Sequence, residues 1–146
     1  MSITIRILGP DDSAILQHVA ADVFDNRVDA RWSAEFLADP RHHVAVAIED
    51  GVVVAMATAF HYVHPDKPPE LWVNEVGVAP THQGRRIGRQ TLTALLAHAK
   101  TLGCQEAWVL TNADNGAARR MYAAVGGREE DEPPVMIVFD LSGADA

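Results

Sequence analysis

The chain has 146 residues, of which 48% are hydrophobic and 22% charged, and its formal net charge is −8. This length and composition predict one globular domain (residues 1–146), and the acidic balance argues against a nucleic-acid partner while it suits a cationic small molecule. No apolar run approaches the ~20 residues of a membrane span, the N-terminus lacks a signal-peptide pattern, and the single Cys104 excludes an intramolecular disulfide, so we expect a cytoplasmic protein without a membrane partner.

In the first forty residues the pattern predicts one strand and two helices. Residues 3–8 (ITIRIL) alternate and are β-rich, which predicts a first strand. An Asp or Ser N-cap at residues 11–13 and the apolar spacing that follows predict a helix to about Phe24. After a polar break, Trp32 to Leu37 are expected to form a second short helix that ends before Pro40.

A hairpin and a central strand follow. Residues 43–48 and 52–61 are predicted to pair across a tight turn, because the Asp50-Gly51 pair supplies the positive φ that such a turn needs. Three prolines within residues 65–69 predict a loop. Glu70 to Val78 is expected to be the central strand, and its Gly77 indicates a bulge or a close ligand approach.

The C-terminal half alternates helices with strands. A helix is expected to begin near Arg85 or Arg86, and its apolar residues recur at the spacing of one buried face: Leu92, Leu95, Leu96 and Ala99. Residues 106–111, 117–125 and 135–141 predict a strand, a helix and a final strand. The whole order predicts an α/β (α+β) fold with a mixed, mostly antiparallel central sheet flanked by helices.

The turn between the central strand and the next helix has the features of an anion site. It carries two glycines and three arginines: Gly84, Arg85, Arg86, Gly88 and Arg89. The first N–H groups of a helix have no internal partner, and the helix dipole adds about half a positive charge there. Glycines let an anion approach the backbone, and arginines add charge-assisted hydrogen bonds. The chain lacks both G-x-x-x-x-G-K-[ST] and G-x-G-x-x-G, which disfavours nucleoside triphosphates and dinucleotides as that anion.

Two motifs in this region resemble a known family. Residues 83–88 (QGRRIG), after a strand that ends VGVAP, resemble the pyrophosphate-binding motif of the GNAT superfamily of N-acetyltransferases, Gln/Arg-x-x-Gly-x-Gly/Ala. Gln83 and Gly88 match, and Arg86 stands where the family usually has its first glycine. The second motif, N-x-x-A-x-x-x-Y-x-x-x-G, is formed by Asn115, Ala118, Tyr122 and Gly126. The resemblance covers residues 70–127 well and implies the GNAT fold.

The same resemblance implies acetyl-CoA as the co-substrate, whereas the spacing of the histidines predicts no metal. Its pyrophosphate is expected on the backbone and side chains of Gln83, Gly84, Arg85, Arg86, Ile87, Gly88 and Arg89. Its pantetheine is expected to pair like a strand with the backbone of Val76, Gly77 and Val78, with Asn115 as a side-chain partner further along. Homodimers are common in the family, which leaves a homodimer open on analogy alone.

Acetyl transfer to an amine needs a base, a polarised carbonyl and an acid for the leaving thiolate. Glu75 lies on the central strand and is the candidate base, provided that burial raises its pKa or a water relays the proton; the alternative is a structural carboxylate paired with an arginine. Tyr122 is the candidate acid, and the alternative is a core aromatic residue. A backbone N–H among residues 76–78 is expected to polarise the carbonyl. The seven histidines lack metal-site spacing.

The acceptor is a primary amine of a small molecule in the leading interpretation. Residues 6–12, the central strand, Ala113-Asp114 and residues 128–130, 135–136 and 139–140 resemble the type I aminoglycoside 3-N-acetyltransferases. That family has an aspartate beside a tyrosine on the strand, where this chain has Glu75 after Asn74. The resemblance implies direct attack in a ternary complex. A polyamine, a peptide or protein N-terminal amine, and a non-catalytic acyl-CoA-binding regulatory module are the alternatives.

Overall fold

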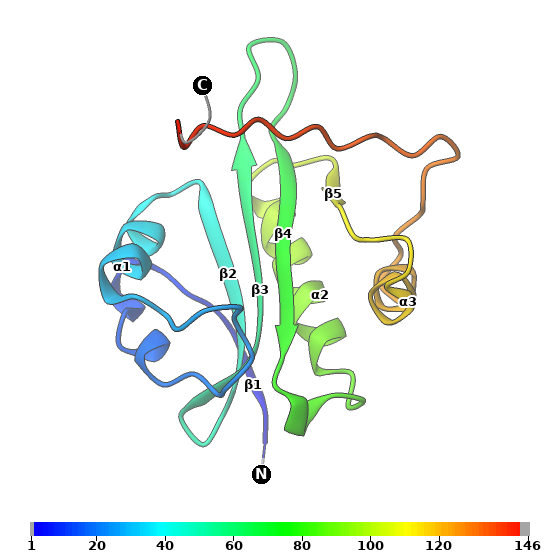
Figure 1. Cartoon of the computed structure of the whole chain (residues 1–146). Helices are drawn as coiled ribbons and strands as arrows, with labels where there is room; N and C mark the ends of the chain where they lie inside the picture. Colours follow the sequence, from blue (N-terminus) through cyan, green and yellow to red (C-terminus); the bar gives the residue numbers. More distant parts are fainter. Residues whose placement is uncertain (1, 144–146) are drawn as a thin grey trace.

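The computed structural model describes residues 2–143, whose strands form one five-stranded sheet in the order β1-β2-β3-β4-β5 (Figure 1). The first four strands pair antiparallel, and β5 pairs parallel with β4. The strand bounds are β1 (Thr4–Ile7), β2 (His42–Glu49), β3 (Val52–Tyr62), β4 (Glu70–Val78) and β5 (Ala107–Val109). The helices are α1 (Ala30–Ala38), α2 (Ile87–Thr101) and α3 (Gly116–Ala124), with short 3-10 helices at Pro10–Asp12, Ile15–Gln17 and Pro80–His82. The predicted fold class is confirmed.

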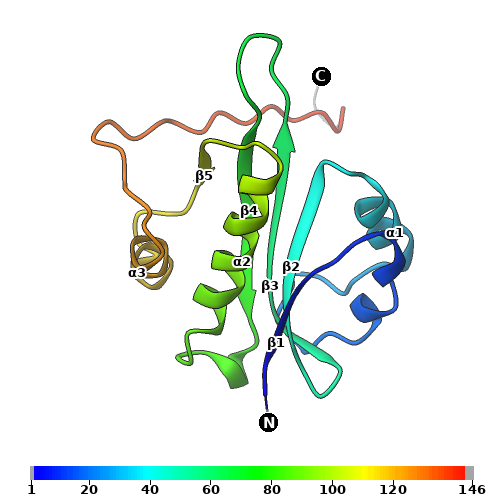
Figure 2. The same ribbon diagram turned by 180° about the vertical axis from the view of Figure 1, so that it is seen from behind.

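Both faces of the sheet are covered over its central strands. Helix α2 crosses one face (Figure 2), where Leu92, Leu95 and Ala99 pack against Leu71 and Val73 of β4. On the other face, the segment before β2 forms a second core cluster, to which the sheet contributes Val44, Val46 and Met56. No helix within residues 2–143 combines the length and the apolar character needed to cross a membrane.

The predicted helix from residue 13 to Phe24 is wrong. Only Ile15–Gln17 forms a single 3-10 turn there. The backbone then pairs with β3 instead of with itself: Val53 N donates to His18 O at 2.8 Å, and Ala20 N donates to Val53 O at 2.9 Å. Leu16 and Val23 are buried as their spacing suggested. The apolar spacing therefore predicted which side chains are buried, but it did not predict the backbone conformation of this segment.

The hairpin, the loop that follows it and the central strand are confirmed. Asp50 and Gly51 have φ of 51° and 76°, which is the left-handed geometry expected for this turn. Strand β4 has the predicted bounds, and α2 begins at Ile87, one or two residues later than expected. Strand β5 is shorter than predicted, with three residues.

The predicted final strand is also wrong. Residues 135–141 have no strand partner among the described residues, and their apolar side chains are 70–92% exposed. The segment leaves α3 and crosses the end of the sheet where β3 ends and β4 begins, instead of lying along β5 (Figure 1). Four acidic residues at 129–132 precede it, and Asp145 of the same acidic stretch lies outside the described residues.

A partly buried histidine pair beside α2 makes stability depend on pH. His43 Nε2 lies 2.7 Å from His61 Nδ1, and the His98 ring is 5.3 Å away. Burial, followed by the positive charge that His61, His98 and His42 carry when protonated, lowers the pKa of His43 from 6.5 to about 4. A lowered histidine pKa means that this stability is complete above pH 6.5 and is lost as the pH falls toward 4.

We expect this group to contribute about 3 kcal/mol of unfolding free energy that disappears between pH 6.5 and 4. Urea unfolding at pH 7, 5.5 and 4 measures it. His43→Gln should flatten the slope in this window, whereas the exposed His18→Gln should not. Identical slopes for both variants would contradict the assignment.

Candidate active site

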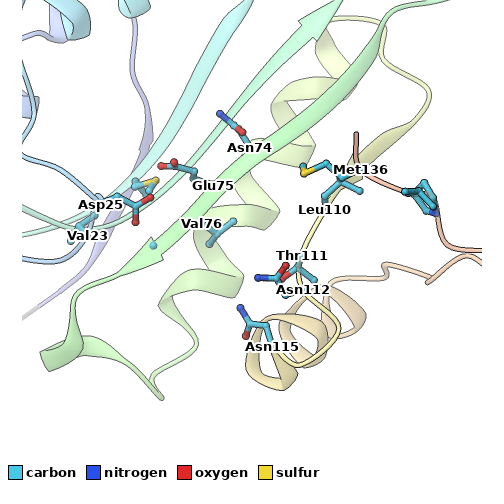
Figure 3. Close-up of a pocket in the computed structure, with 14 residues that line it drawn as sticks. Val23, Asp25, Asn74, Glu75, Val76, Leu110, Thr111, Asn112, Asn115 and Met136 are labelled. Atoms are coloured by element: carbon cyan, nitrogen blue, oxygen red, sulfur yellow. The ribbon is translucent and has the colours of Figure 1, made fainter. Parts of the chain in front are cut away.

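The described part of the chain contains an open cleft where β4 and β5 separate. The two strands pair only between Leu71–Val73 and Ala107–Val109, and no further pairs extend along β4. A cavity of about 670 Å³ lies beyond that point (Figure 3). It is lined by Val23, Asp25, Met56, Asn74, Glu75, Val76, Gly77, Leu110, Thr111, Asn112, Asn115, Pro134, Val135 and Met136.

A β-bulge in the middle of β4 shapes one wall of this cleft. Thr58 of β3 lies opposite Glu75 and Ala59 lies opposite Val73, so Asn74 is an extra residue on β4. Side chains on a strand alternate between the two faces, and one extra residue shifts that alternation. Asn74 and Glu75 therefore both line the cleft, on the side of the sheet away from α2.

The bulge also turns backbone groups toward the open side of β4. Before the bulge, Leu71 N donates to Glu106 O on the β5 side, and after it Ala79 N donates to Val54 O on the β3 side. Backbone groups alternate along a strand, so the N–H and C=O groups of Val76 and Val78 face the side where β5 has diverged. Gln83 Nε2 donates to the Val78 carbonyl at 3.3 Å, in agreement with this direction.

Two carboxylates face the cleft from different elements. Figure 3 shows Glu75 on β4 and Asp25 on the loop before α1, both on the same side of the strand. Partial desolvation raises the pKa of Glu75, and the negative charge of Asp25 raises it further. No ion pair to Glu75 is found within residues 2–143, so the alternative of a structural pair with an arginine has no support there.

Gly77 allows the Asp25 loop to approach β4. A Cβ on Gly77 would lie 2.1 Å from the Val23 carbonyl oxygen, two residues before Asp25. The predicted close approach at this glycine is thus made by the chain's own backbone. Nothing in the sequence indicated this contact or the contribution of Asp25 to the cleft.

The turn before α2 presents backbone donors and cations together. Gly84 has φ of +78°, and α2 continues for 15 residues from Ile87. Arg85 lies 3.8 Å from Glu49, which His82 also contacts at 3.0 Å, so part of its charge is compensated. No ion pair reaches Arg86 or Arg89 from any residue that the structure describes. A Cβ on Gly88 would come within 3.0 Å of Val78 Cγ2, so this glycine permits close packing of α2 on β4.

Arg86 occupies the left-handed region, with φ of 62° and ψ of 18°. This conformation costs a non-glycine residue about 1–2 kcal/mol, which explains why glycine is usual at this position of the motif. We expect Arg86→Gly to raise the unfolding free energy by about 1 kcal/mol, measured by urea denaturation. Arg89→Gly, in the first helical turn, should lower it by a similar amount; a decrease for both variants would contradict the strain assignment.

Asn115 and Tyr122 lie on α3, on the far side of the cleft. Asn115 caps the helix, because its Oδ1 accepts a hydrogen bond from Ala118 N at 3.1 Å, and it also lines the cavity. Tyr122 is half-buried against the core under α2, and burial raises its pKa. Glu75, Val76, Gly77 and Asn115 thus meet at the cavity, whereas Tyr122 and residues 83–89 do not line it. Sequence reasoning missed Asn74, Thr111 and Asn112 as lining residues.

The profile of the Acetyltransferase (GNAT) family matches residues 12–126. The chain belongs to the GNAT family and is an acetyltransferase. This GNAT chain is 34% identical over 127 residues to the N-alpha-acetyltransferase RimI of Mycobacterium tuberculosis, covering 85% of the chain and 77% of that protein. It is 40% identical over 65 residues to the mycothiol acetyltransferase of Saccharopolyspora erythraea, but that match spans only 43% of the chain and 21% of the relative.

Solved structures show the same fold at low sequence identity. An aminoglycoside acetyltransferase from an uncultured soil metagenomic sample, in complex with sisomicin, superposes with a TM-score of 0.78 at 18% identity, covering 95% of this GNAT chain and 96% of that one. The aminoglycoside N-acetyltransferase AAC(6')-Iy in complex with CoA gives a TM-score of 0.75 at 20% identity, with 96% and 95% covered.

Proposed function

We propose that this GNAT protein transfers the acetyl group of acetyl-CoA to a primary amine of a small cationic acceptor, by direct attack in a ternary complex. The observation that carries this proposal is the position of Glu75. Its carboxylate faces the cleft beside Asp25, next to the outward-facing backbone of Val76 and Val78 on the same strand. A base, a site for the thioester and a second negative charge thus converge at one place.

The residues around the cleft fit the co-substrate in charge and shape. The first N–H groups of α2, together with Arg86 and Arg89, which form no ion pair with any described residue, suit a diphosphate bound over residues 83–89. The open edge of Val76 and Val78 suits the amides of pantetheine, with Gly77 between them. Gln83, which donates to Val78 O, would have to release that carbonyl or share it. The Asn115 amide nitrogen faces the same cavity and supplies a further donor.

In the proposed reaction, the acceptor nitrogen attacks the thioester carbonyl, a C–N bond forms and the C–S bond breaks. Glu75 takes the proton that the nitrogen loses, directly or through a water, and its raised pKa makes it a better base for that step. A backbone N–H of Val76 or Val78 stabilises the developing oxyanion. Tyr122, whose pKa is raised and whose hydroxyl is therefore protonated at neutral pH, gives a proton to the leaving thiolate.

An aminoglycoside, acetylated at its 3-amino group, is the leading acceptor. Two carboxylates in one cleft attract a polycationic aminosugar, and the fold neighbours include proteins named for aminoglycosides. A peptide N-terminal amine is the second candidate, because RimI is a relative at 34% identity over 85% of the chain. An acceptor of the kind used by mycothiol acetyltransferases is a third candidate, because several relatives have that name.

The test is thiol release from acetyl-CoA across a panel of acceptors: sisomicin and other aminoglycosides, spermidine, peptides with free N-termini and an aminosugar thiol. Mass spectrometry of the product then locates the acetyl group. We expect release with at least one aminoglycoside and acetylation of its 3-amine. Release only with peptides would replace the acceptor assignment and keep the reaction. Release with none, despite tight acetyl-CoA binding, would overturn the catalytic proposal and favour a binding module.

A further inference from the structure

An aromatic row, formed by Phe60, Trp72 and Trp108, crosses the sheet on the same face as the cleft. The three residues stand opposite one another on β3, β4 and β5. The Phe60 and Trp72 rings lie 5.4 Å apart, and the Trp72 and Trp108 indoles are stacked at 4.3 Å. Leu71 and Val73 pack under α2, and side chains alternate along a strand, so the aromatic row faces the side away from α2.

The aromatic row adjoins the cavity directly. Asn74 and Leu110 line the cavity (Figure 3), and each follows a tryptophan of the row by two residues. At ~3.3 Å per residue, Trp72 lies about 10 Å along β4 from Glu75. A molecule whose reacting amine lies at Glu75 can therefore reach the aromatic row if it extends along β4 toward the start of the strand.

The indole pair is held in position and remains open. The Trp108 side chain hydrogen-bonds to the Tyr62 hydroxyl, which donates to Glu70 Oε2 at 3.2 Å. His64 Nε2 lies 3.3 Å from the same Glu70 oxygen. Both indoles are partly exposed, and residues 131–143, which cross this end of the sheet, are themselves exposed throughout (Figure 1). The pair is thus fixed before a ligand arrives, which lowers the entropic cost of binding.

An aminosugar ring fits the aromatic row better than a peptide does. The C–H face of the ring is apolar and packs on an indole, and its ammonium groups are attracted to tryptophan faces and to carboxylates. Carboxylates are present at Glu70 and Glu106, each two residues before a tryptophan of the row. A peptide backbone binds to a free strand edge, but at this level β4 is already paired with both β3 and β5.

We propose that Trp72 and Trp108 bind a second ring of the acceptor while its reacting amine lies at Glu75. The acceptor is then an aminosugar of two or more rings, and the indole pair selects it over one-ring amines, linear polyamines and peptides. The inference rests on the proposed acetyl transfer, because that reaction requires the reacting amine to lie beside Glu75.

Tryptophan fluorescence tests the binding without any need for catalysis. The chain has three tryptophans, and the third, Trp32, is 65% exposed on α1 and lies outside the aromatic row. In Trp32→Leu, which should keep wild-type thiol release, all tryptophan emission therefore comes from Trp72 and Trp108. We expect saturable quenching by sisomicin and none by spermidine or a free-N-terminal peptide at equal concentration. No saturable change with sisomicin, or an equal change with spermidine, would overturn the proposal.

Steady-state kinetics gives a second, independent readout. Trp72→Leu should raise KM for sisomicin about tenfold relative to KM for the one-ring amine 2-deoxystreptamine, and the loss should appear in KM and not in kcat. Trp72→Phe keeps an aromatic ring and should recover most of that ratio. The fluorescence test leaves the row unaltered, so it still decides the question if Trp72→Leu does not fold.

The two readouts also separate this inference from the proposed function. Quenching by sisomicin without thiol release from acetyl-CoA would keep the ring subsite and overturn the proposed acetyl transfer. Thiol release with sisomicin, together with a KM ratio that does not respond to Trp72→Leu, would overturn the ring subsite and keep the acetyl transfer.

Discussion

Replacing Glu75 by glutamine should lower kcat/KM about a hundredfold to a thousandfold near neutral pH, because the variant keeps the shape of the side chain and removes the base. The loss should be largest at a pH where Glu75 is deprotonated, because only there does the wild type have a base that the variant lacks. In the wild type, kcat/KM should rise with pH as Glu75 deprotonates, and the raised pKa places that rise above pH 4.5. Glu75→Gln should lack this rise.

Two further variants make the experiment specific to this carboxylate. Glu70→Gln lies on the same strand outside the cleft and should leave kcat/KM within a factor of about three, as expected for a residue away from the chemistry. Asp25→Asn removes the charge that raises the pKa of Glu75, so the rise in kcat/KM should move to lower pH. Steady-state rates of thiol release, measured over a range of pH, give kcat/KM for all three variants. A Glu75→Gln profile that matches the wild type would remove Glu75 from the mechanism.

Gly77→Ala should be the most damaging small substitution in the cleft. The added Cβ would lie 2.1 Å from the Val23 carbonyl oxygen, and both groups belong to backbone that cannot rotate away. We expect a loss of about 2–4 kcal/mol in unfolding free energy. We also expect a higher KM for the amine, because the displaced loop carries Asp25.

The control is Gly9→Ala, where the nearest atom to an added Cβ is Asp12 Oδ2 at 3.8 Å, an ordinary contact. That variant should change the unfolding free energy by less than about 1 kcal/mol. Urea denaturation and amine KM values measure both effects. Wild-type stability for Gly77→Ala would mean that the loop does not dock on β4 as described.

Secondary-structure elements whose conformation is determined by their own residues could be predicted from the sequence. The hairpin follows from Asp50-Gly51, and β4, α2 and α3 follow from apolar periodicity and their end signals. The two errors have a tertiary cause. Residues 13–24 carry a helical apolar spacing, but part of this segment hydrogen-bonds to Val53 instead. Residues 135–141 carry a strand pattern, but no strand within residues 2–143 pairs with them.

The same distinction holds for the candidate site: features within one stretch of chain could be predicted, and features that depend on tertiary contacts could not. The motif at residues 83–88 and Glu75 could be found from residue types and spacing along one stretch of chain. The contribution of Asp25 could not, because it depends on a loop that reaches β4 only at Gly77. The position of the bulge at Asn74 could not be predicted either, because a bulge is defined by how β4 pairs with β3 and not by the residue types in β4.

The surplus residue at Asn74 means that the cleft face of β4 carries two polar side chains in succession, where a regular strand would carry one. Deleting Asn74 would restore regular pairing with β3 and leave Glu75 opposite Thr58 and Val73 opposite Ala59. Glu75 would still face the cleft, because Val73 faces α2 and the next residue of a regular strand faces the other side. The backbone of Val76 and Val78 would keep its direction for the same reason. Shortening this strand by one residue is therefore a mild change: it removes an amide from the cleft wall and leaves the carboxylate in place.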